Sequence, residues 1–170
     1  MRLFDISVLG WIHTIACIIA LPSGLYLLAA AKGTKRHRSI GRWYLVSMVI
    51  GAATALGLYA PIAGIAPGFN RFHWMAVVTL VALAFAYTGA RRQAQTPWAY
   101  VHPMGMVVSY YMLIGALINE SFARVHALAA FGARTVGLVQ AANMALFLAL
   151  LVAVAVKVGH KRARLRAAAA

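Results

Sequence analysis

The chain has 170 residues, of which 64% are hydrophobic and 11% are charged, whereas a soluble domain is about half apolar and about a quarter charged. This composition excludes an ordinary soluble protein and indicates an integral membrane protein. The net charge of +14 comes from Lys and Arg that lie between apolar runs, where they suit anionic lipid headgroups and make nucleic-acid binding a poor interpretation.

Five apolar runs follow one another along the chain, and none has a charged residue in its interior. A transmembrane helix needs about 20 apolar residues to cross ~30 Å of hydrocarbon, and each run is about that long. The runs cover residues 6–31, 43–62, 72–90, 98–118 and 137–156. We therefore predict an all-α fold, an integral membrane bundle of five transmembrane helices that forms a single domain over residues 1–170.

The loops between the runs predict the orientation of the chain. Most of the Lys and Arg follow the first, third and fifth runs, and loops with an excess of Lys and Arg face the cytoplasm. The N-terminus is therefore expected outside and the C-terminus in the cytoplasm. The cytoplasmic loops are expected to contact anionic lipid headgroups.

The first cytoplasmic loop reads KGTKRHRSIGRWY over residues 32–44. Gly41, two residues before Trp43, predicts a tight turn that leads into the second run. Arg38 and Arg42 are expected to face an anionic group, because bidentate guanidinium contacts suit a lipid phosphate, a haem propionate or a quinone oxygen.

This loop resembles the KGT-x-x-HR-x-x-GR-x-Y signature of a family of small bacterial membrane proteins that is catalogued as domain of unknown function 2306. Two further features are similar to that family: His13 in the first run, and the fourth-run string HPMGMVVSY that begins at His102. The resemblance implies a multi-helix membrane fold and a multi-pass location in the bacterial inner (cytoplasmic) membrane. It implies no particular activity.

Histidines inside or next to the runs are the main candidates for chemistry, because polar groups are costly within the membrane. His13 and His73 are expected in the outer leaflet, and His37 and His102 at the inner surface. Two histidines at matching depth can ligate the iron of b-type haem from opposite faces. Two such pairs would carry electrons across the bilayer, with quinone as a candidate partner. The chain has a single cysteine and no CxxCH motif, so covalently attached haem is excluded.

The same residues support rival interpretations. His13, His73, His126 and Glu120 could bind zinc or copper through three nitrogens and one oxygen. The leading hypothesis is a membrane-embedded redox protein that binds haem b through histidines. The alternative is a non-enzymatic accessory or metal-binding subunit that packs against other membrane protein subunits. The sequence leaves both open, and with them the question of whether the protein is an enzyme.

Overall fold

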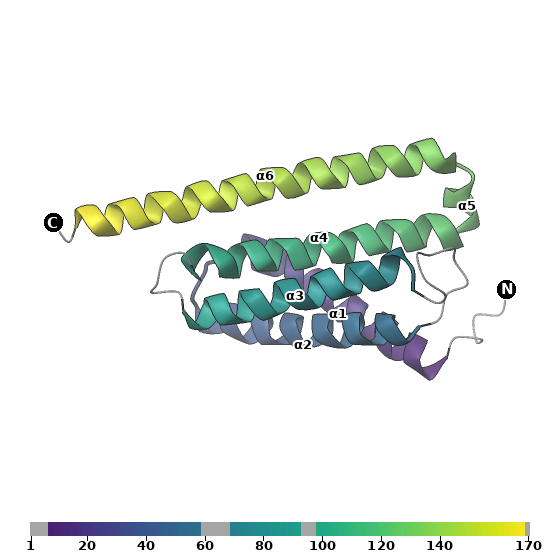
Figure 1. Ribbon diagram of the computed structural model, residues 1–170, viewed down its shortest axis with the longest axis horizontal. Helices are drawn as coiled ribbons and strands as arrows, with labels where there is room; N and C mark the ends of the chain where they lie inside the picture. Colours follow the sequence, from purple (N-terminus) through teal and green to yellow (C-terminus); the bar gives the residue numbers. More distant parts are fainter. Residues whose placement is uncertain (1–6, 59–68, 93–97, 169–170) are drawn as a thin grey trace. The chain divides into compact units, whose positions relative to one another are not determined.

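The computed structural model describes residues 7–58, 69–92 and 98–168. Its regular elements are helices, and five of those described are long and apolar enough to cross a membrane: α1, α2, α3, α4 and α6. The predicted all-α fold with five candidate spans is therefore confirmed. The elements, shown in Figure 1, are α1 (Val8–Ala29), α2 (Lys35–Gly57), α3 (Arg71–Arg91), α4 (Trp98–Arg124), α5 (His126–Ala129) and α6 (Gly132–Ala167).

The chain divides into two compact units, Met1–Val81 and Ala82–Ala170, and the boundary lies within α3. The first unit holds α1, α2 and the first half of α3. The second holds the rest of α3 together with α4, α5 and α6. The prediction of a single transmembrane domain stays a prediction.

In the first unit, α1 packs against α2. The buried residues of α1 are mostly small and recur at helical spacing, and α2 buries small residues as well. A Cβ atom added at Gly51 of α2 would lie 3.4 Å from the Sγ atom of Cys17 on α1. Small residues let two helix backbones approach closely, which stabilises helix pairs in lipid, where the hydrophobic effect does not drive association. The small buried residues are Gly10, Ala16, Ala20 and Gly24 on α1 and Ser47, Gly51 and Ala52 on α2.

Helix α2 begins earlier than its apolar run. It starts at Lys35, because the Thr34 hydroxyl caps it by accepting a hydrogen bond from the His37 N–H at 3.0 Å, as an N-cap residue does. The chain turns at Gly33, whose φ of 80° is accessible to glycine at little cost. Gly41 lies inside the helix, so the tight turn predicted there is wrong.

In the second unit, α4 packs against α6, and the short helix α5 connects them (Figure 1). Gln140 of α6 donates a hydrogen bond from Nε2 to the Gly115 carbonyl of α4 at 3.1 Å. One or two turns away, the rings of Tyr111 and Phe147 stack with centroids 4.2 Å apart. These contacts fix the register of the two helices.

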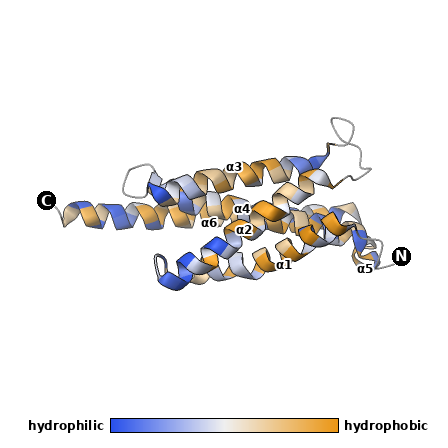
Figure 2. Cartoon of the chain, turned by 90° about the horizontal axis from the view of Figure 1, so that it is seen from below, coloured by the Kyte–Doolittle hydropathy of each residue, from blue (hydrophilic) through white to orange (hydrophobic). Residues whose placement is uncertain are grey.

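Helix α6 is longer than a membrane requires. Its 36 residues rise about 54 Å at ~1.5 Å per residue, whereas the hydrocarbon layer is ~30 Å thick. The helix continues past residue 156, where its apolar run ends, to Ala167. Its last turns, residues 157–167, therefore form a helical basic extension, in which hydrophilic residues alternate with apolar ones in Figure 2.

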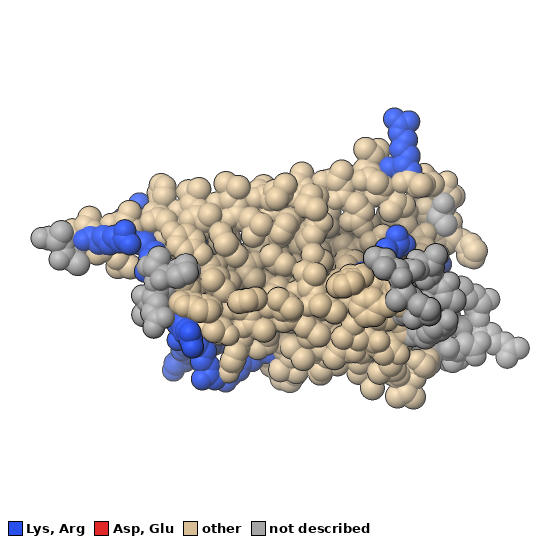
Figure 3. Space-filling model, in the orientation of Figure 1, with Lys and Arg blue, Asp and Glu red and all other residues tan. Residues whose placement is uncertain are grey.

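The helices expose apolar side chains along their middle parts and basic side chains near their ends. Leu146 and Val152 of α6 are 61% and 63% exposed, and Figure 2 shows the apolar residues along the middle of the helices. In Figure 3, Lys and Arg gather at the start of α2 and the end of α6. Large exposed apolar surfaces are unusual in soluble proteins, whereas in a bilayer they meet acyl chains.

Candidate functional site

His13 of α1 links α1 to α2 by a hydrogen bond. Its Nδ1 atom lies 2.9 Å from the Gly51 carbonyl oxygen and 3.3 Å from the Thr54 Oγ1 atom. A carbonyl oxygen can only accept, so Nδ1 carries the proton and donates it. The Nε2 atom of the neutral ring therefore has a lone pair, and the Cys17 Sγ atom, one turn along α1, lies 3.7 Å from it.

His102 makes the same kind of bond within the second unit. Its Nδ1 atom lies 2.9 Å from the carbonyl oxygen of Ala86, which is 1% exposed. Here too Nδ1 must donate, and Nε2 keeps its lone pair. His13 and His102 thus have the same tautomer, and in each case a backbone carbonyl on a neighbouring helix holds the ring.

Two glycines surround the His102 bond and bring the end of α3 against the start of α4. A Cβ atom at Gly89 would lie 2.6 Å from the His102 backbone nitrogen. One at Gly105 would lie 2.7 Å from the Ala82 carbonyl oxygen and 2.9 Å from the Ala86 Cβ atom. Because backbone atoms cannot move aside as a flexible side chain can, only glycine fits at either position. The position of the His102 ring therefore depends on a backbone-to-backbone contact.

His73 has a different local role. It is 4% exposed, and the Asn70 backbone N–H donates a hydrogen bond to its Nδ1 atom at 3.1 Å. Asn70 in turn caps α3, because its Oδ1 atom accepts from the Phe72 N–H at 2.9 Å. This reciprocal arrangement is a capping box with histidine in the third helical position.

Two contacts of the His73 Nδ1 atom require opposite tautomers. Nδ1 accepts from the Asn70 N–H when the proton lies on Nε2, and it donates to Asn70 Oδ1, 3.0 Å away, when the proton lies on Nδ1. Only the second tautomer, which gives up the hydrogen bond from the Asn70 N–H, presents Nε2 as a ligand. The predicted pairing of His13 with His73 stays a prediction.

The residues predicted at the inner surface lie on the first turns of α2 and the start of α4. His37 is half-buried and Arg42 is exposed. Arg38 donates from Nη1 to the Gly33 carbonyl oxygen at 2.7 Å. His37 belongs to the first unit and His102 to the second, and their predicted pairing likewise stays a prediction.

The predicted zinc or copper ligands are held separately. Glu120 forms an ion pair with Arg124, one turn along α4, and His126 is exposed on α5. Within the described ranges, no three His, Cys, Asp or Glu side chains group closely enough to hold a metal ion. The predicted metal site draws on residues of both units and stays a prediction.

Several residues that define these sites carry weaker signals in the sequence. The spacing of Asn70 and His73 matches a capping box and is enough to assign His73 to the start of α3. Ala82, Ala86 and Gly89 form a small-residue stripe on α3 that marks a close helix contact. Thr54 and Cys17 carry no signal of their own, since their proximity to His13 follows from the packing of α1 against α2.

No protein-family model, no curated protein and no solved structure matches this chain. The resemblance to domain of unknown function 2306 therefore stays a prediction, and the function has to be inferred from the residues themselves.

Proposed function

We propose that this chain is a multi-pass protein of the bacterial cytoplasmic membrane, with its N-terminus outside and its C-terminus in the cytoplasm. Five long apolar helices support insertion. The basic residues at the start of α2 and the end of α6 (Figure 3) support the orientation, because such residues favour the cytoplasmic side.

Within this membrane, we propose that the protein binds b-type haem at two separate sites, one at His13 in the first unit and one at His102 in the second, and transfers electrons. The observation that carries this proposal is the shared tautomer of the two rings. In each, the Nδ1–H group donates to a backbone carbonyl at 2.9 Å and Nε2 is left as the basic nitrogen. Histidines that bind metals in proteins are held in this way, since the second hydrogen bond fixes the ring and raises its basicity.

Of the four histidines predicted to bind haem, His13 and His102 are retained here. A neutral imidazole ligates iron through a lone pair, and His73 presents Nε2 for this only if it gives up the hydrogen bond that the Asn70 N–H donates to its Nδ1 atom. His102 can bind a metal through Nε2 with no change of tautomer, and His13 can do so once the Cys17 thiol, whose Sγ atom lies 3.7 Å from Nε2, turns away. Haem would supply the one-electron redox step, and at each site the histidine would hold the iron and tune its potential through its carbonyl partner. Quinone is the proposed electron partner.

The second candidate is a non-enzymatic accessory subunit, and one observation favours it. None of the described residues of α6 is buried, and this helix exposes Leu138, Leu146 and Val156. An exposed apolar face along a 36-residue helix could pack against another membrane protein. In that case His13 and His102 serve only as interhelical hydrogen bonds, each worth about 0.6 kcal/mol on average in a membrane protein.

A reduced-minus-oxidised absorbance spectrum of the purified protein separates the two candidates. We expect a b-type haem difference spectrum that decreases in His13→Ala and in His102→Ala, because each substitution removes a nitrogen that would hold haem at one of the two sites. Added imidazole should partly restore the spectrum of either variant. His160→Ala, at an exposed position in the basic extension, is the control and should keep the full spectrum.

Two results would reject the haem proposal. One is a purified protein without haem absorbance. The other is a haem spectrum that neither His13→Ala nor His102→Ala alters. Either result leaves the accessory-subunit candidate.

A further inference from the structure

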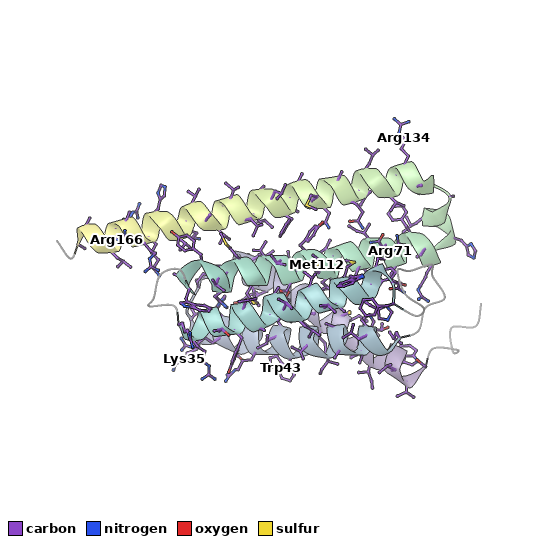
Figure 4. The ribbon with its side chains drawn as sticks, in the orientation of Figure 1. Lys35, Trp43, Arg71, Met112, Arg134 and Arg166 are labelled. Carbon is purple, nitrogen blue, oxygen red and sulfur yellow. The ribbon has the colours of Figure 1, made fainter. Side chains whose placement is uncertain are left out.

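The first two turns of α2 carry a basic face. Lys35, Arg38 and Arg42 are exposed and follow the i, i+3, i+7 spacing that places residues on one side of a helix. Ser39 lies between them on the same side. Lys35 projects away from the helix in Figure 4. We call Lys35, Arg38 and Arg42 the basic face.

The chain does not supply the charge that would neutralise this face. Like charges at these spacings repel one another. The whole sequence has two acidic residues, and one of them, Glu120, pairs with Arg124 on α4. At most one acidic side chain of this sequence is therefore left to form an ion pair with the three basic residues. An external anion is the better partner.

The neighbouring basic residues have roles within the chain. Lys32 donates from Nζ to the carbonyl oxygens of Leu27 and Leu28 and so caps the end of α1. The Arg36 guanidinium lies over the Tyr26 ring, 5.3 Å from its centroid. Arg38 uses Nη1 to bond the Gly33 carbonyl oxygen, which fixes the guanidinium while leaving N–H groups for a second acceptor.

The depth of the basic face matches the phosphate layer of a bilayer. The apolar run of α2 begins at Trp43, which is 64% exposed and points outward in Figure 4; exposed tryptophans at the ends of spans mark the interface. At ~1.5 Å per residue, Arg42, Arg38 and Lys35 lie about 1.5, 8 and 12 Å beyond it. The headgroup region is about 5–8 Å thick on each side, so Arg42 and Arg38 lie within or next to it.

We propose that the basic face binds the headgroup phosphate of an anionic phospholipid in the cytoplasmic leaflet. Arg38 and Arg42 contact the phosphate, Lys35 adds charge from the aqueous side, and Trp43 lies beside the upper acyl chain. The proposal needs the proposed membrane insertion but not haem. It also selects lipid phosphate over propionate or quinone oxygen as the anion for Arg38 and Arg42, because a phospholipid is present at this depth whether or not a cofactor binds.

The fluorescence of Trp43 tests this in vesicles of defined composition. The variant used carries Trp11→Phe, Trp74→Phe and Trp98→Phe, so that Trp43 is its single tryptophan and the source of the measured fluorescence. It is reconstituted in phosphatidylcholine that contains a minor fraction of brominated phosphatidylglycerol or, for comparison, the same fraction of brominated phosphatidylcholine. We expect stronger quenching by phosphatidylglycerol, since each basic residue near the surface favours anionic lipid by about fivefold.

Two triple variants with equal loss of charge identify the residues. Lys35→Gln, Arg38→Gln and Arg42→Gln together should remove the preference for phosphatidylglycerol. Lys161→Gln, Arg162→Gln and Arg164→Gln in the basic extension should leave it intact. If the first variant fails to fold, the salt dependence of quenching in the parent protein tests the proposal instead. Salt at 0.5 M shortens the Debye length to about 4 Å and should weaken the preference for phosphatidylglycerol. Equal quenching by the two lipids in the parent protein, or equal loss in both triple variants, would overturn the proposal.

Discussion

The contact between α3 and α4 makes a sharp prediction about Gly89 and Gly105. Substitution of either glycine by alanine should destabilise the protein, because the new methyl group would meet backbone atoms at 2.6 Å and 2.7 Å. Ordinary contact begins near 3.4 Å, so α3 and α4 must separate locally by about 0.7 Å. The His102 Nδ1 to Ala86 oxygen distance, 2.9 Å now, would then approach 3.6 Å, which is no longer a hydrogen bond.

The expected cost has two parts. Overpacking of a well-packed contact typically costs about 1–3 kcal/mol, and loss of an interhelical hydrogen bond in a membrane protein costs about 0.6 kcal/mol on average. We expect Gly89→Ala and Gly105→Ala each to lower the free energy of unfolding by about 1–3 kcal/mol, because the higher helix propensity of alanine offsets up to about 1 kcal/mol of these two costs. Reversible unfolding in mixed detergent micelles, with helicity as the signal, measures this quantity.

Gly41 and Gly137 supply the matched controls. Both lie inside helices, and a Cβ atom at either would meet nothing within 4 Å. Alanine there should be neutral or should stabilise by up to about 1 kcal/mol, since glycine weakens a helix interior. If Gly89→Ala and Gly105→Ala proved as stable as these controls, the inferred close contact between α3 and α4 would be incorrect.

The capping box, the α4 to α6 contact and the orientation give three further predictions. Asn70→Ala should cost about 1 kcal/mol of stability through loss of the α3 cap while leaving any haem spectrum unchanged; loss of the spectrum would return His73 to the ligand set. Gln140→Leu should cost about 0.6 kcal/mol in the same micelle assay, and an unchanged midpoint would mean that the bond to Gly115 contributes nothing. In a Cys17→Ser background, Thr34→Cys should react in intact cells with a membrane-permeant maleimide but not with an impermeant one. Ala130→Cys should react with both reagents. The reverse pattern would invert the proposed orientation.

The five candidate spans could be predicted because about 20 consecutive apolar residues are typical of a helix that crosses a membrane and rare elsewhere. The ends of the helices could not be predicted in this way. A hydropathy pattern marks where hydrocarbon begins, whereas a helix ends where its backbone finds other partners. Helix α2 therefore starts at the Thr34 cap, ahead of Trp43, and α6 continues through its basic extension to Ala167.

The candidate site was predictable in part for a similar reason. The cost of imidazole in or next to a membrane makes His13, His73, His37 and His102 candidates. The tautomers of His13 and His102 depend on the carbonyls of Gly51 and Ala86, which lie 38 and 16 residues away in sequence. No local pattern encodes such pairs. His73 is predicted as a ligand because an imidazole is costly in a membrane; its capping role is weakly marked in the sequence, since Asn70 has the right spacing but a capping box usually has Glu or Gln in the third helical position.

His13 and His102 are each proposed to present Nε2 to a haem iron. The haem content of the purified protein, measured as the pyridine haemochrome after expression in cells supplied with a haem precursor, tests this claim most directly. We predict stoichiometric b-type haem that falls in His13→Ala and His102→Ala and persists in His160→Ala. A folded protein that purifies without haem under these conditions would contradict the claim.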